Sequence, residues 1–101
     1  MTIDGFTVNT FGKLYRSCGN CKNNGEARHV VMTNVKATSG KVLAGINSNY
    51  GDSATIDSSN CATSVKEICD EYTGVSDNSK EPKKIGSGAS KSCKISTLKS
   101  C

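Results

Sequence analysis

Alternating apolar and polar positions dominate the first half of the chain, in short runs separated by polar turns. A period of two is typical of a half-buried β-strand. The run His29–Val35 is the clearest example, because it is rich in β-branched residues. On this pattern we expect strands at Ile3–Val8, Gly12–Ser17, His29–Val35, Val42–Ile46 and Ala54–Ile56.

The spacing of these strands indicates a repeat. Phe6, Val31 and Ile56 follow one another at intervals of 25 positions, and a shorter strand lies inside each interval. Strands that recur with a period in the twenties are typical of a solenoid, in which each coil stacks on the next. About three repeats are needed for stability, because one coil cannot bury its apolar side alone. We therefore expect an all-β solenoid of few coils.

The pattern changes beyond residue 61. Four apolar positions there have helical spacing, namely Val65, Ile68, Cys69 and Tyr72. This spacing predicts a short helix or helical turn over the end of the stack. Residues 74–91 are rich in Ser, Lys and Gly, which predicts a loop, and a last strand is expected at 93–101. We accordingly divide the chain into solenoid coils at 1–73 and a basic wrap, pinned by cysteines, at 74–101.

The composition agrees with short strands. Of the 101 residues, 35% are hydrophobic and 5% are aromatic, and tryptophan is absent. Such a chain does not build a thick helical core, whereas short strands joined by polar turns suit it.

Six cysteines are the strongest compositional signal. In a small polar chain an even number of cysteines is typical of a disulfide framework formed in an oxidising compartment. Sequence proximity favours the pairs Cys18–Cys21, Cys61–Cys69 and Cys93–Cys101, but it leaves other pairings open. A zinc site is a weaker alternative, because His29 is the single histidine. A redox motif is weaker still, because no βαβ pattern surrounds Cys18 and Cys21.

The net charge of +4 is unevenly placed. Residues 1–79 contain seven Lys and Arg against eight acids, whereas residues 80–101 contain six Lys against Glu81 alone. The tail has no aromatic residue and no arginine, so we expect no nucleic-acid partner. Its basic excess is either a solvated surface or an attraction to a polyanion such as a polyuronate. No stretch approaches the length of a membrane span, and we expect no membrane partner.

The beginning of the chain does not resemble a signal peptide. Met1 is followed by Thr2, Ile3, Asp4 and Gly5, without a basic region or an apolar run. Because the cysteines indicate secretion, we expect that the front of the precursor is missing from this sequence.

An eleven-residue motif carries a family resemblance. The segment Phe11–Cys21 reads FGKLYRSCGNC, and it is followed in order by Arg28–Val31 (RHVV), Leu43–Asn47 (LAGIN) and Asn49–Ile56 (NYGDSATI). These segments resemble the family 3 pectate lyases. The resemblance implies a right-handed parallel β-helix, of which this chain would form the C-terminal coils. It also implies a secreted, extracellular enzyme that cleaves polygalacturonate, the acidic polymer of pectin in plant cell walls, by calcium-dependent β-elimination.

The same resemblance assigns Lys13 and Arg16 to the substrate cleft. Arg16 can hold a uronate carboxylate through two parallel hydrogen bonds. Lys13 can supply a point charge to a second uronate or to the negative charge that develops during the reaction. Residues three apart on a flat strand face opposite sides, so both can reach one cleft only if the chain turns or bulges between them.

The resemblance places the proton-abstracting lysine and the calcium-binding acids upstream of this motif. Asp4 is the single acid before Lys13, and the adjacent pair Asp70 and Glu71 does not form an EF-hand loop. Calcium takes six to eight oxygen ligands, so we assign no residue of this chain to a metal. The chain is therefore expected to be a partial enzyme. The alternative is a non-catalytic secreted module that binds acidic cell-wall polysaccharide.

The remaining polar candidates are interpreted as structural. Asp52 beside Gly51 is expected in a turn, Asn47 and Asn49 are expected to bond stacked turns, and His29 is expected to be a strand residue. Full-length relatives are implied to be monomers. A stack that lacks its first coils exposes apolar surface and unpaired strand edges, so we expect this chain alone to aggregate or form oligomers.

Overall fold

The computed structural model describes residues 1–21, 27–77 and 79–101. Its strands are β1 (Thr2–Asp4), β2 (Thr7–Arg16), β3 (His29–Thr33), β4 (Lys36–Asn47), β5 (Ser53–Ile56), β6 (Cys61–Thr73), β7 (Lys83–Ser87) and β8 (Cys93–Ile95). A single 3-10 turn, η1 (Ser48–Tyr50), is the one helical element among the described residues. None of the described helical segments is long and apolar enough to cross a membrane.

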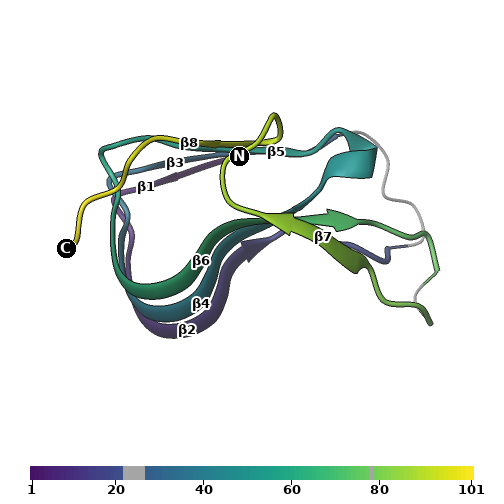
Figure 1. Ribbon diagram of the computed structural model, residues 1–101, viewed down its shortest axis with the longest axis horizontal. Helices are drawn as coiled ribbons and strands as arrows, with labels where there is room; N and C mark the ends of the chain where they lie inside the picture. Colours follow the sequence, from purple (N-terminus) through teal and green to yellow (C-terminus); the bar gives the residue numbers. More distant parts are fainter. Residues whose placement is uncertain (22–26, 78) are drawn as a thin grey trace.

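The strands form two parallel sheets that face each other (Figure 1). One sheet has the order β1-β3-β5-β8, and the other has the order β2-β4-β6-β7. The chain alternates between them from β1 to β6, so each pair of strands is one coil, and every pairing except β6 with β7 is parallel. This is a parallel β-helix, and the predicted all-β solenoid is confirmed.

The coils differ in length. Asp4 pairs with Thr33, 29 residues along the chain, whereas Val35 and Asn60, one coil apart, are separated by 25 residues. The expected register of 25 residues is therefore wrong for the first coil, where Val31 pairs with Thr2 rather than with Phe6. It is also wrong by one residue between β3 and β5, where Val31 pairs with Thr55 rather than with Ile56. The expected strand at 3–8 is also wrong, because a turn at Gly5, with φ of 70°, divides it into β1 and β2.

The helix expected at 65–72 is wrong, because this segment lies within the long strand β6. Ladder bonds to β4 run from Cys61 to Tyr72. The strand bends, with Ser64 at a φ of 56°, and the adjacent residues Ile68 and Cys69 both pack against the core. Two inward residues in succession imitate the helical spacing that the sequence displays. The loop expected at 74–91 likewise contains β7, which extends the sheet beyond β6.

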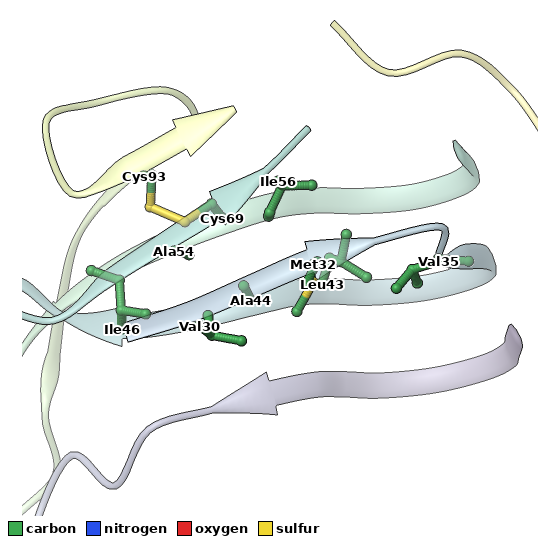
Figure 2. Close-up of a cluster of buried hydrophobic side chains, with 11 residues drawn as sticks. Val30, Met32, Val35, Leu43, Ala44, Ile46, Ala54, Ile56, Cys69 and Cys93 are labelled. Atoms are coloured by element: carbon green, nitrogen blue, oxygen red, sulfur yellow. A yellow bond between two sulfur atoms is a disulfide. The ribbon is translucent and has the colours of Figure 1, made fainter. Parts of the chain in front are cut away.

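The core lies between the two sheets (Figure 2). Its fully buried members are Val30, Met32, Val35, Ala37, Leu43, Ala44, Ile46, Ala54, Ile56, Cys69 and Cys93. Most come from β3, β4 and β5, each of which has a neighbouring strand on both sides. Phe6 of the outermost coil is 47% exposed. Burial therefore rises from the first coil towards the middle of the stack.

Three disulfides join Cys18 to Cys21, Cys61 to Cys101 and Cys69 to Cys93. The expected pair Cys18–Cys21 is confirmed, and the other two expected pairs are wrong. Cys61 and Cys69 lie eight residues apart on β6, where the chain rises roughly 3.3 Å per residue, so even the bent strand holds them too far apart for a disulfide. Each instead bonds to the C-terminal segment, which lies beside β6.

Candidate active site

Two rows of side chains cross the sheet formed by β2, β4 and β6. In the first row, Lys13 of β2 pairs with Val42 of β4, which pairs with Glu67 of β6. In the second row, Arg16 pairs with Gly45, which pairs with Asp70. In each row the cation is thus on β2 and the acid is on β6. The residue between them on β4 is a valine in the first row and a glycine in the second.

A cleft of about 480 Å³ opens over these rows. Its lining consists of Gly12, Lys13, Lys41, Val42, Lys66, Glu67, Asp70, Tyr72 and Lys84. Lys13 lines the cleft directly, whereas Arg16 does not line it. The Arg16 guanidinium lies 3.9 Å from the centre of the ring of Tyr72, which does line the cleft. The structure therefore brings the two predicted residues to one side of the sheet.

The bend that this arrangement needs is present. Leu14 and Tyr15, which separate Lys13 from Arg16, both pack against the core. The neighbouring strand repeats the feature, because Leu43 and Ala44 are both fully buried. Two successive inward residues interrupt the alternation of a flat strand, and the residues on either side of them can point outward together.

The Arg16 side chain is half-buried and closely surrounded. Its Nη1 donates to Asn47 Oδ1 at 3.1 Å and to the carbonyl oxygen of Ser17. A Cβ atom at Gly19 would lie 2.5 Å from Nη2, so the guanidinium also lies against the loop backbone. Burial lowers the pKa of Arg16, while Tyr72 and nearby carboxylates oppose this shift. The guanidinium stays charged at neutral pH because its ordinary pKa is above about 12.

The acidic side of the cleft is neutralised from β7. Lys84 Nζ lies 2.6 Å from Glu67 Oε2 and 3.5 Å from Asp70 Oδ2. The hydrogen bond from Lys84 lowers the pKa of Glu67, and the same bond raises the pKa of Lys84. Asp70 is 1% exposed, and its carboxylate oxygens make no hydrogen bond of ordinary geometry to the described residues. Its burial raises its pKa, and the nearby Glu67 carboxylate adds to the rise, although Ser87 and Lys84 lie close enough to oppose it.

The raised pKa of Asp70 predicts that its ionised form destabilises the fold. Its folded-state pKa lies above the unfolded value of 3.8, so the folded protein binds the proton more tightly and stability falls as pH rises through this interval. Asp70→Asn should therefore raise the melting temperature at pH 8 and change it little at pH 3. Thermal melts followed by circular dichroism at both pH values measure this difference.

Glu67→Gln serves as the control of opposite sign. The folded-state pKa of Glu67 is lowered below 4.5, so its ionised form stabilises the fold above that pH and the stabilisation is lost on acidification. This variant should melt earlier than the wild type at pH 8. A lower melting temperature of Asp70→Asn at pH 8 would show that ionised Asp70 stabilises the fold through Lys84.

A buried polar network holds the turn behind the cleft. Asp52 is 2% exposed and accepts bonds from Ser17 Oγ at 2.8 Å, from the Arg28 backbone at 2.8 Å and from the Asn47 backbone at 3.1 Å. Asn47 Nδ2 also donates to the Cys18 carbonyl of the preceding coil at 2.9 Å. Asp52 is thus a turn residue, as expected, but sequence analysis missed its role as the centre of this network.

The other polar candidates also link stacked coils. Asn49 exchanges two hydrogen bonds with the backbone of Gly74 in the next coil, at 2.7 and 3.0 Å. His29 begins β3, and its Nδ1 lies 2.6 Å from Ser53 Oγ on the neighbouring strand. The expectations that Asn47 and Asn49 bond stacked turns and that His29 is a strand residue are confirmed.

Several cleft residues escaped sequence analysis, namely Lys41, Lys66, Glu67, Asp70, Tyr72 and Lys84. The one feature of the sequence that could have identified them is the coil length, because residues one coil apart lie in the same row across the sheet. Reading that signal required the correct register, and the first coil is longer than the second. The lysine from β7 carried no signal, because β7 pairs antiparallel outside the repeat.

The donor groups of the cleft do not suit calcium. The described residues contain no group of three or more His, Cys, Asp or Glu side chains that could hold a metal. The two carboxylates that do lie together, Glu67 and Asp70, already face the ammonium of Lys84. Calcium requires six to eight oxygen ligands, and an adjacent fixed cation opposes its binding.

Comparison with known proteins identifies the family. The profile described as Pectate lyase matches residues 1–79. The chain is 63% identical over 94 residues to a probable pectate lyase E of Neosartorya fischeri, an alignment that covers 93% of this chain and 36% of that protein. It is 59% identical over 102 residues to a probable pectate lyase D of Aspergillus fumigatus, covering all of this chain and 41% of that protein. It thus spans well under half the length of these relatives.

Solved structures agree with the sequence comparison. Pectate lyase PelI of Erwinia chrysanthemi superposes with a TM-score of 0.84 at 33% identity, covering 99% of this chain and 35% of that one. The complex of PelI with tetragalacturonic acid gives the same TM-score and identity, with 38% of that chain covered. By its sequence and by its fold, this chain belongs to the pectate lyase family.

Proposed function

We propose that this chain supplies the substrate-holding cations of a secreted pectate lyase that cleaves polygalacturonate by calcium-dependent β-elimination. The observation that carries the proposal is the position of Lys13 in the lining of a cleft of about 480 Å³, with Arg16 packed on Tyr72, which also lines that cleft. The complex of the related PelI with tetragalacturonic acid supports an oligogalacturonate as the ligand. Three disulfides support an oxidising, extracellular location.

The reaction explains why cations are needed. A base removes the proton on C5 of a galacturonate, next to the carboxylate, and the electron pair forms a double bond between C4 and C5. The bond from C4 to the glycosidic oxygen then breaks, and that oxygen takes up a proton. Negative charge develops on the carboxylate as the C5 proton leaves. Fixed positive groups stabilise this charge more strongly in the transition state than in the ground state.

Arg16 and Lys13 have different roles in this proposal. The hydrogen bonds of Arg16 to described residues use Nη1, and Nη2 lies beside the loop at Gly19. A carboxylate would bind at the edge formed by Nε and Nη2, next to this loop. Two parallel bonds to that edge would fix the plane of the uronate. Lys13 lines the cleft itself and would hold a second carboxylate as a point charge. The base and the calcium ligands are assigned to none of the described residues.

The test combines binding and turnover. Titration of tetragalacturonate into the chain should show that Arg16→Ala and Lys13→Ala each weaken binding about tenfold or more, since a charge-assisted hydrogen bond contributes about 1.5–3 kcal/mol. Lys94→Ala, which removes an exposed lysine from the other sheet, is the control and should bind as the wild type does. Any turnover of polygalacturonate is followed by the ultraviolet absorbance of the unsaturated product, with and without a chelator.

The outcomes separate two functions. Calcium-dependent turnover that Arg16→Ala abolishes would place a complete active site in this chain and overturn the assignment of the base elsewhere. If the chain binds tetragalacturonate with the same affinity with and without calcium and shows no turnover, the second candidate function is favoured, which is a polysaccharide-binding module. The observation that supports this candidate is the presence of lysines in the lining of the cleft. Wild-type binding by both cleft variants, with loss in Lys94→Ala, would move the binding surface to the basic tail.

A further inference from the structure

Arg16 is held by a residue two strands away. Its guanidinium lies 3.9 Å from the centre of the Tyr72 ring, although Arg16 is on β2, Tyr72 is on β6 and β4 runs between them. Adjacent strands are about 4.8 Å apart, so the arginine side chain must extend across β4 to reach this ring. The contact is therefore possible only if β4 leaves the path open.

Gly45 of β4 opens that path. It pairs with Arg16 on one side and with Asp70 on the other. A Cβ atom at this position would lie 2.7 Å from Arg16 Cδ and 3.2 Å from Tyr72 Cε1. Because Gly45 does not adopt a positive φ, its backbone conformation is open to other residues. The requirement for glycine here comes from the arginine and the tyrosine that pack above it.

We propose that Tyr72 is a positioning residue for Arg16 and that Gly45 provides the space in which the pair forms. The proposal rests on the assignment of Arg16 to the uronate carboxylate. The ring covers one face of the guanidinium, and Asn47 together with the Ser17 carbonyl engages Nη1. The plane of the guanidinium is thereby set before a ligand arrives, and the proposed ligand edge, formed by Nε and Nη2, lies next to the loop at Gly19.

The physical benefit is preorganisation. A free arginine side chain loses rotamer freedom when it binds a carboxylate, and a side chain that is already ordered avoids that loss. The interaction between a cation and an aromatic face also keeps the positive charge stable in a half-buried place. Removal of the ring should therefore weaken carboxylate binding, even though the arginine that binds the carboxylate is still present.

The first experiment is a double-mutant cycle on tetragalacturonate binding, measured by calorimetry. Tyr72→Leu should weaken binding about three- to tenfold, while Tyr72→Phe, which keeps the ring, should stay within about twofold of the wild type. In the Arg16→Ala background, Tyr72→Leu should have no further effect, because a residue that acts through Arg16 cannot act without it. Gly45→Ala should weaken binding as Tyr72→Leu does.

The second experiment reads the position of the arginine directly. In nuclear magnetic resonance spectra, the ring current of Tyr72 should shift the Arg16 Cδ and Nε proton signals upfield. The shift should persist in Tyr72→Phe and disappear in Tyr72→Leu. Phe11→Leu is the matched control, because Phe11 of β2 likewise packs over a glycine of β4, Gly40, but does not contact Arg16. It should change neither the Arg16 signals nor the affinity.

Each outcome has one meaning. Unchanged binding in Arg16→Ala would overturn the proposed function. In that case the Arg16 proton signals of the wild type and the Tyr72 variants would still test whether Tyr72 holds the arginine in position. Weaker binding in Arg16→Ala but wild-type affinity in Tyr72→Leu would overturn the positioning role alone. A further loss on adding Tyr72→Leu to Arg16→Ala would mean that Tyr72 contacts the ligand itself, and it would likewise overturn the proposal.

Discussion

Asp52→Ala is expected to lower the free energy of unfolding by about 3 kcal/mol or more, because it leaves several buried donors without an acceptor. Those donors are the Ser17 hydroxyl, the Arg28 backbone and the Asn47 backbone. They belong to two different coils and meet at one carboxylate that is 2% exposed. A buried donor without a partner costs about 1–3 kcal/mol, so even a partly relaxed network loses a large share of typical domain stability.

Urea unfolding followed by circular dichroism measures this loss. Asp77→Ala is the control, since Asp77 is exposed and its carboxylate accepts bonds from Ser79 of its own turn. Its effect should stay within about 1 kcal/mol. Equal midpoints for the two variants would show that the Asp52 network contributes no more than a surface turn.

The same variant should also weaken ligand binding. Asn47 is held by Asp52 and in turn accepts a hydrogen bond from Arg16 Nη1. Loss of the carboxylate therefore frees the residue that fixes the arginine. Asp52→Asn keeps the shape but replaces one acceptor with a donor, so it should fall between the wild type and Asp52→Ala in both stability and affinity.

Joint replacement of Cys69 and Cys93 by alanine is expected to lower the free energy of unfolding by about 3–4 kcal/mol. The two cysteines are fully buried in the core (Figure 2), and their bond closes a loop with a sequence separation of 24. The cross-link restricts the unfolded chain, and it also ties β8 to the long strand β6. Without it, the C-terminal segment is held by packing, by the pairing of β8 with β5 and by the bond between Cys61 and Cys101.

The pair Cys18 and Cys21 provides the comparison. Their bond has a sequence separation of only 3, and a short loop loses less entropy on closure, so the double alanine variant should lose about 2 kcal/mol. Urea unfolding without reductant gives both values. A larger loss from the pair at 18 and 21 would mean that the network around Ser17 and Cys18, rather than chain entropy, governs the effect.

The strands of the middle coil could be predicted because their residues are buried in a regular way. The run His29–Val35 contains β3, and Val42–Ile46 lies within β4. The core takes Val30, Met32 and Val35 from the first run and Leu43, Ala44 and Ile46 from the second. The helix expected at 65–72 could not be corrected from the sequence. A bent strand with two successive inward residues has the same apolar spacing as a helical turn, and only the ladder to β4 distinguishes them.

The sequence by itself determined the family and the solenoid architecture, because these depend on local motifs and on the approximate period of the strands. The same motif is the basis for proposing Lys13 and Arg16 as the residues that bind the uronates. The disulfide partners of β6, the row that joins Arg16 to Gly45 and Asp70, and the contact between Arg16 and Tyr72 were decided only by the tertiary structure. The physical reason is that neighbours in a β-helix are one coil apart. A difference of four residues between coils of 29 and 25 residues changes which side chains meet. The local sequence pattern does not indicate this difference in coil length.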